Sequence, residues 1–323
     1  MIFTNIPKNG ASWSEELPYS FATELAEPSD VSVEVRDADS DELLGTMRLY
    51  SVTRATIDIA PIVRRAVSMS PATVKAPSII ASLAVRRVVV VANGVASSAV
   101  SLFRAPYTPT EFGVLSSMST ANGIASGDVL RFTLNIVGGV RARVVEYGTE
   151  GKRDIAVLAY SADERVVEVV VPIGELSPTA DRVELMIVSG PTTASWEYRV
   201  RERTSGSRTL LWYNVRGGIE SYAFPYCPLV SRTADVVATP TRLGSIAYLS
   251  SARSRVRLTS ALLSRSEQER LSEILLSPYI FEDCGGRVSR VELSQRELRY
   301  DDHGAFERLS LDIDEEWKGG ALL

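Results

Sequence analysis

Apolar and polar residues alternate along the first third of the chain. Between residues 31 and 36 valine alternates with serine, glutamate and arginine, so an extended segment there has one apolar face. A polar turn follows, and the composition of Leu43–Val52 is typical of the return strand of a hairpin. Further strands are predicted at 84–91 and 100–105, with the turn pair Asn93-Gly94 between them. These strands predict a first β-sandwich domain.

Short strand patterns continue in the middle of the chain, after a passage rich in serine and glycine. Turn residues recur every eight to twelve positions, which is typical of an antiparallel sandwich or barrel. The predicted strands are 129–137, 140–147, 155–160, 166–173, 183–188 and 195–203. They predict a second β-sandwich domain.

The pattern changes after residue 205. Strands are predicted at 209–213 and 221–224, and helical spacing of apolar residues predicts one helix at about 265–276. Ser266 and Glu269 fit a capping box at its start, and Pro278 follows its end. The third region is therefore β-rich with one helix.

The predicted fold class is mainly β, with tandem antiparallel β-sandwich domains followed by a C-terminal β-rich α+β domain. A length of 323 residues suits two or three domains. The predicted domains are residues 1–105, 106–205 and 206–323.

Composition limits the classes of function. Apolar residues make up 45% and charged residues 23% of the chain, as in ordinary globular proteins. A net charge of -5 argues against a general nucleic-acid-binding protein. The first twenty residues lack the apolar run of a secretory signal, and purely apolar stretches such as Val88–Ala92 are too short to span a bilayer. We expect a cytoplasmic product without a membrane segment.

Motifs for catalysis or metal binding are not recognisable. The one histidine, His303, lies among turn residues, and no nucleophile elbow, Walker A loop or dinucleotide fingerprint occurs. Cys227 and Cys284 lie far apart in the sequence and are expected to be buried thiols. We therefore expect no catalytic residues, no cofactor and no metal, which indicates a protein that is not an enzyme. A hydrolase that uses two of the forty carboxylates is an alternative that sequence spacing cannot test.

Three aspartates in the first hairpin, Asp37, Asp39 and Asp41, resemble the start of a calcium-binding loop. The rest of that loop is missing, because Glu42 stands where the loop needs glycine and Arg48 stands where it needs a bidentate glutamate. We interpret the segment as a solvated hairpin turn.

Two sets of arginines occupy alternate positions of predicted strands, which places each set on one strand face. The sets are Arg199, Arg201 and Arg203, and Arg253, Arg255 and Arg257. Each set could contact phosphates or an acidic partner, or it could face solvent opposite acidic residues of a neighbouring strand. Because the chain is acidic, we favour cross-strand balance or a protein interface over nucleic acid.

The segment Leu211–Pro225 carries a more specific pattern. Its residues resemble a strand that reads W-x-N-x-x-G-G-x-[DE]-x-[YF]-x-F in tail-associated and other virion structural proteins from phages and prophages of gut Bacteroidota. The matching residues are Trp212, Asn214, Gly217, Gly218, Glu220, Tyr222 and Phe224. The resemblance implies a stack of β-sandwich domains, without enzymatic activity, that assembles with copies of itself or with other virion proteins in a tail or baseplate. It also implies cytoplasmic assembly followed by incorporation into the virion.

The chemistry of the residues in this segment also supports an interpretation that does not depend on the resemblance. Gly217 and Gly218 are expected to turn the chain between two short strands, where either positive φ or a close backbone approach requires glycine. The aromatic residues are expected to be buried on one side of that hairpin. The alternative is a carbohydrate- or surface-binding module that presents aromatic faces, with four candidate residues: Trp196, Trp212, Tyr213 and Tyr222.

Overall fold

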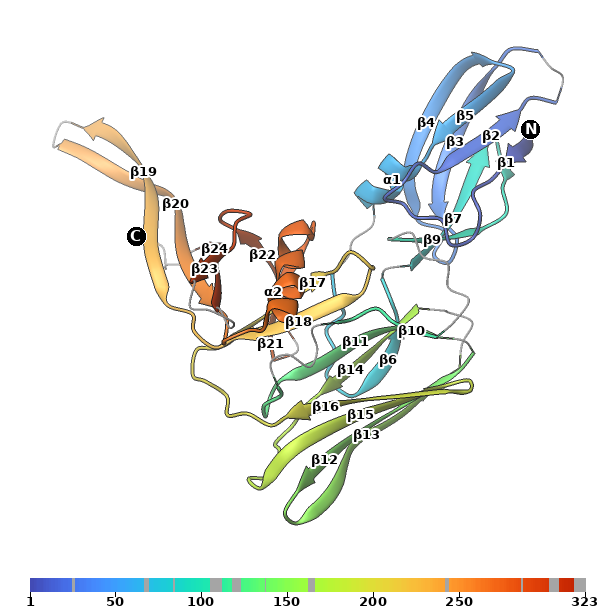
Figure 1. Ribbon diagram of the computed structural model, residues 1–323. Coiled ribbons are helices and arrows are strands. Elements are labelled where there is room, and N and C mark those ends of the chain that lie inside the picture. Colours follow the sequence, from blue (N-terminus) through green and yellow to red (C-terminus); the bar gives the residue numbers. More distant parts are fainter. Residues whose placement is uncertain are drawn as a thin grey trace.

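Sheets of antiparallel strands make up most of the protein, and the mainly β fold is confirmed (Figure 1). The computed structural model describes residues 1–24, 27–66, 70–83, 85–104, 112–117, 123–136, 138–161, 166–241, 244–285, 287–301 and 308–316. Three separate groups of buried apolar residues form its main cores.

The N-terminal part contains two sheets and a short helix. One sheet has the order β1-β2-β5, formed by β1 (Ile2–Asn5), β2 (Pro18–Ala22) and β5 (Arg54–Asp58). The other contains β3 (Ser29–Asp37), β4 (Leu43–Val52), β7 (Val85–Ala92), β8 (Val95–Ala96) and β9 (Val100–Phe103). Helix α1 (Ala60–Ala66) follows β5.

The predicted first hairpin is confirmed. β3 pairs with β4 and with β7, and Val31, Val33 and Val35 are fully buried while Ser32 between them is exposed. Asn93 and Gly94 both have positive φ, at 47° and 80°, in the turn between β7 and β8. The alternating pattern in the sequence therefore marks the strand faces that are buried.

The middle part is a sandwich of two four-stranded sheets. One has the order β10-β11-β14-β6, formed by β10 (Gly113–Val114), β11 (Val129–Asn135), β14 (Val166–Pro172) and β6 (Ser78–Ala81). The other has the order β13-β12-β15-β16, formed by β12 (Val140–Gly148), β13 (Gly151–Tyr160), β15 (Ala180–Ser189) and β16 (Thr192–Arg199). Strand β6 precedes residue 105 in the chain, yet it pairs with β14 of this sandwich.

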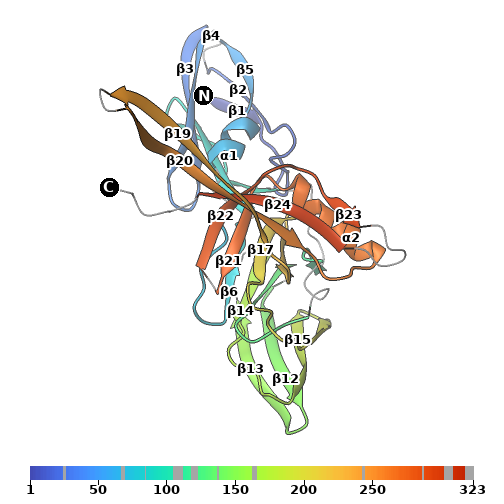
Figure 2. The same ribbon diagram turned by 90° about the vertical axis from the view of Figure 1, so that its left-hand side faces the viewer.

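The C-terminal part is an eight-stranded sheet with one helix beside it (Figure 2). Its main order is β18-β17-β21-β22-β24-β20-β19, and β23 also pairs with β24. The strands are β17 (Arg208–Tyr213), β18 (Ile219–Phe224), β19 (Leu229–Thr241), β20 (Gly244–Thr259), β21 (Ile280–Cys284), β22 (Arg287–Leu293), β23 (Arg299–Asp301) and β24 (Arg308–Glu316).

The predicted helix at about 265–276 is confirmed, but its capping residues differ from the predicted pair. It comprises α2 (Arg265–Ser272) and a 3-10 turn, Glu273–Leu276. The residue at its N-cap is Ser264, whose backbone N–H donates to the Glu267 carboxylate at 2.7 Å. The prediction that Ser266 and Glu269 form the capping box is wrong, because the helix begins two residues earlier than that pair requires.

Candidate functional site

The β17–β18 hairpin is buried on both faces. Trp212, Tyr222 and Phe224 are at most 1% exposed and belong to the C-terminal core, whereas Tyr213 and Ile219 belong to the N-terminal core. Successive residues of a strand alternate between its faces, so one hairpin contributes to two cores. Burial of the aromatic residues is confirmed, but the prediction that all lie on one side is wrong for Tyr213.

The turn of this hairpin needs both of its glycines. Gly217 has a φ of 81°, a conformation that side chains with a Cβ rarely adopt. A Cβ on Gly218 would lie 2.6 Å from the carbonyl carbon of Leu115 and 2.7 Å from its oxygen. Both expected reasons for glycine are therefore found: positive φ at Gly217 and a close backbone approach at Gly218.

Asn214 joins this turn to the segment before β11. Its side-chain amide donates to the Leu115 carbonyl at 2.6 Å and to Glu220 at 2.5 Å. Its side-chain oxygen accepts from the backbone N–H groups of Arg216 and Gly218, both at 2.9 Å. Asn214 is 1% exposed, so these bonds replace those it would make with water.

Glu220 and three hydroxyl residues complete the contact with the middle sandwich. The Glu220 carboxylate accepts from the backbone N–H of Ser117 at 2.7 Å and from its hydroxyl at 2.9 Å. Ser116 donates its hydroxyl to the Ile219 carbonyl at 2.6 Å, and the Ile219 N–H donates to the Thr133 hydroxyl at 2.9 Å. We call this set, which is buried except for the half-buried Ser117, the domain junction: Leu115, Ser116, Ser117, Thr133, Asn214, Gly218 and Glu220.

The Gly218→Ala variant is expected to be less stable by about 1–3 kcal/mol, because the added methyl group would overlap a backbone carbonyl that cannot rotate away. Urea denaturation measures the difference. The matched control is Gly174→Ala, since nothing lies within 4 Å of a Cβ at that exposed position. Equal midpoints for the two variants would contradict the close approach at Leu115.

A second buried contact links the same two parts of the chain. Arg131 on β11 is fully buried and lies 3.3 Å from the carboxylate of Asp283 on β21, which is 3% exposed. The guanidinium also donates to the Ala72 carbonyl at 3.0 Å. Sequence reasoning missed this pair, because 152 positions separate its members and neither lies in a recognisable motif.

Glu168 is a buried carboxyl on β14, the neighbour of β11. It accepts a hydrogen bond from the Ser82 hydroxyl at 3.0 Å. Burial raises its pKa, although the hydrogen bonds and the Arg131 charge oppose the change. Its neutral form is thus favoured in the folded protein more than in the unfolded chain.

The raised pKa of Glu168 gives the stability of the protein a pH dependence. Below the unfolded pKa of about 4.3, Glu168 is neutral in both states and does not lower the free energy of unfolding. As the pH rises through the higher folded pKa, the buried carboxyl has to ionise and stability is lost. The Glu168→Gln variant should therefore melt at a higher temperature than the unmodified protein at pH 8 and at the same temperature at pH 4. Calorimetry at both values, with exposed Glu150→Gln as control, checks this; equal midpoints at pH 8 would contradict it.

The first arginine set does not lie on one strand. β16 ends at Arg199, and the next residues pair instead with Ile124, whose N–H donates to the Arg199 carbonyl while its carbonyl accepts from the Arg201 N–H. Arg201 forms an ion pair with Asp128 at 2.8 Å. The predicted strand through Arg203 is therefore wrong, because the chain leaves the sheet to contact the segment before β11.

The second arginine set lies on β20 as predicted. Arg257 makes two bonds with Asp312 on β24, at 2.9 and 3.1 Å, and Arg255 lies 3.1 Å from Asp314 on the same strand. The prediction that acidic residues of a neighbouring strand balance the arginine charges is thus confirmed for these two arginines. Arg253 is exposed and lies opposite Glu316 in the strand register.

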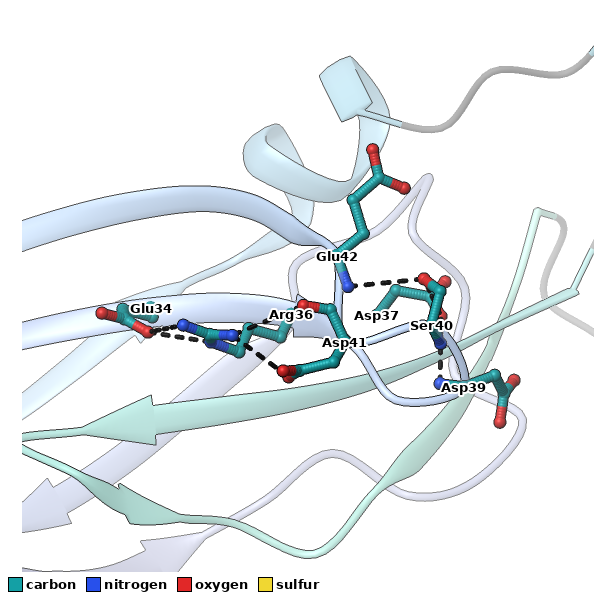
Figure 3. Close-up of polar contacts among 7 residues, drawn as sticks. All are labelled: Glu34, Arg36, Asp37, Asp39, Ser40, Asp41 and Glu42. Atoms are coloured by element: carbon teal, nitrogen blue, oxygen red, sulfur yellow. Dashed lines mark hydrogen bonds and ion pairs between the residues drawn. The ribbon is translucent and has the colours of Figure 1, made fainter.

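The carboxylates of Asp37, Asp39 and Asp41 in the turn after β3 do not converge on one point (Figure 3). Asp37 accepts from the backbone N–H groups of Asp39 and Ser40 at 3.0 and 2.9 Å. Burial opposes ionisation of Asp37, yet these bonds and Arg86 hold its pKa below the usual value. Asp41 binds Arg36, and the Asp39 carboxylate points away from the Asp41 carboxylate. The predicted hairpin turn is confirmed.

Other candidate chemistry is limited in the ranges that the structure describes. No group of three or more His, Cys, Asp or Glu residues there could hold a metal ion. Neither of the α-helices there has the length and apolar content to cross a bilayer. Both cysteines are free thiols; Cys227 is half-buried and Cys284 is exposed, so the prediction that both are buried is wrong. His303 lies outside the described residues.

Three of the four aromatic residues proposed for carbohydrate binding are not available to a ligand. Trp212, Tyr213 and Tyr222 are at most 1% exposed. Trp196 is half-buried, and its ring centroid lies 4.5 Å from that of Phe132. The structure thus contradicts the assignment of Trp212, Tyr213 and Tyr222 to sugar stacking and confirms that these three pack in the cores.

Comparisons with known proteins do not place the chain in a family. No family model matches it, and no curated protein matches it. Among solved structures, extracellular domains 3–5 of Drosophila OTK align with 8% identity and a TM-score of 0.26, covering 85% of this chain and 90% of that one. The E. coli alpha-2-macroglobulin aligns with 7% identity and a TM-score of 0.23, covering 91% of this chain and 23% of that one. These TM-scores are too low to support an inference about function.

Proposed function

We propose that this chain is a non-enzymatic structural protein of a phage or prophage particle, associated with the tail or baseplate, that acts by packing against copies of itself or other virion proteins. The observation that supports this proposal most is the role of the residues that resemble the virion signature. Asn214, Gly218 and Glu220 form the domain junction, and Trp212, Tyr222 and Phe224 fill the core beside it. The signature positions serve the architecture of the chain, as a structural family would require.

The physical character of the domain junction supports the same proposal. A buried polar network strongly favours one arrangement, because any other arrangement leaves its groups unpaired in a medium of low dielectric constant. The junction and the Arg131–Asp283 pair join the middle sandwich to the C-terminal sheet in this way. A fixed relation between the middle sandwich and the C-terminal sheet is useful to a component that must occupy a defined place in an assembly.

The proposal is tested by the genes beside this one and by the particles themselves. We expect neighbouring genes for a portal, a tape measure or a tail sheath, and we expect the chain in sedimented particles, detected by mass spectrometry in amounts comparable to those of other structural proteins. A neighbourhood of polysaccharide-utilisation genes, or particles that lack the chain, would overturn it.

A further inference from the structure

The β19–β20 hairpin extends beyond the rest of the protein in both views (Figures 1 and 2). We call residues 229–254 the arm. β20 pairs with β24 only from Arg253 to Thr259, and β19 is the last strand of its sheet. The outer eight residues of β19, from 234 to 241, give the arm a reach of roughly 26 Å at about 3.3 Å per residue. Over that distance, within the described chain, each strand pairs only with the other.

The sequence of the arm contains several apolar residues, although no other strand of the described chain pairs with its outer part. The strand register places Val236 opposite Leu249 and Val237 opposite Tyr248. The paired positions of the two strands are therefore apolar in sequence on both strands. At the base of the arm, Leu229 and Val230 are 48% and 45% exposed. Two-stranded ribbons are marginally stable in water, and exposed apolar residues such as these two are common in binding sites.

The charge of the arm indicates what covers it. Arg232, Arg242, Arg253 and Asp235 give the arm a net charge of +2, whereas the whole chain carries -5, so the rest carries -7. Contact between two arms would bring like charges together, whereas contact between an arm and the rest of another copy brings opposite charges together. A second copy of this chain, contacted on its acidic body, therefore fits the arm best.

We propose that the arm of one molecule docks on the body of a second copy. This inference rests on the proposed function only for the idea that the chain packs with copies of itself. Because the arm and the surface that receives it are different parts of the molecule, the contact is head-to-tail and repeats in a ring or an open row.

The test compares the full chain with a variant whose arm is shortened. Replacing residues 233–253 with Asn-Gly joins Arg232 to Ser254, which face each other in the register, through a two-residue turn that suits a hairpin. The Asp312 and Asp314 pairs of β20 are kept. Light scattering over a wide concentration range should show association of the full chain that weakens as salt is added, and a monomeric shortened variant with unchanged circular dichroism.

Mixing the two proteins tests the direction of the contact. The shortened variant keeps the receiving body, so it should bind the full chain and limit the size of its assemblies. The double variant Leu229→Ser, Val230→Ser should weaken self-association about tenfold, and Val157→Ser, an equally apolar change at a 69% exposed position of β13, should not.

Three outcomes would overturn the inference. The first is a shortened variant that associates as the full chain does, and the second is a full chain that stays monomeric at every concentration. The third is a shortened variant that fails to bind the full chain, which would indicate contact between arms. Each would leave the proposed function standing if the neighbouring genes and the particle contents support it, because the partners would then be other virion proteins.

Discussion

Replacing Asp283 with alanine is expected to lower the free energy of unfolding by about 3–5 kcal/mol, the largest electrostatic effect that we expect in this protein. The change leaves the fully buried Arg131 without its carboxylate. A guanidinium keeps its proton even when it is buried, so the charge of this residue would remain without a partner. Urea denaturation followed by circular dichroism measures the loss.

Asp154→Ala is the matched control, because it removes the same side chain from an ion pair at the surface. Asp154 and Arg143 are 44% and 43% exposed, and surface pairs of this kind contribute about 0–1 kcal/mol. The double variant Asp283→Ala, Arg131→Met should recover most of the stability, since it removes the buried charge as well as its partner. If Asp283→Ala costs no more than Asp154→Ala, the pair does not hold the two parts of the chain together.

Trp212→Ala is expected to cost a similar amount, about 3–5 kcal/mol, for a different reason. The indole is fully buried in the C-terminal core beside Tyr222 and Leu210, so its removal leaves a cavity that surrounding backbone can fill only in part. The denaturation midpoint of this variant should fall far below that of the unmodified protein.

Trp196→Ala is the control for this effect, since it removes the same side chain from the half-buried edge of the middle sandwich. The control should lose less stability. A Trp212→Ala variant as stable as the Trp196→Ala variant would contradict the burial of Trp212, and the sugar-stacking hypothesis would then return for this residue.

The sequence was most informative where a single chemical pattern determines local structure. Alternating valines predicted the buried face of β3, and the apolar spacing predicted α2. The glycine pair predicted the geometry of the β17–β18 turn. Each of these depends on residues close together in the chain, so composition and spacing are sufficient.

Contacts between distant segments could not be predicted in this way. Arg131 and Asp283 look like any other charged residues in strand patterns, and their meeting depends on how two sheets pack. Arg201 was assigned to a strand because alternation continued through it, but pairing with Ile124 takes the chain out of the sheet first. Tyr213 was placed with the other aromatics because nothing in the sequence indicates a second core on its side of the hairpin.

The position of β6 has a consequence for how this chain could be divided or recombined. The chain leaves the N-terminal sheets to form β6 at the edge of the middle sandwich, and then returns to form β7 in the N-terminal part. A cut at residue 105 would leave β14 without an edge partner and β6 without a sheet. Gene fragments that exchange one sandwich for another would therefore have to carry both, so the first two parts of the chain are expected to be inherited as one unit.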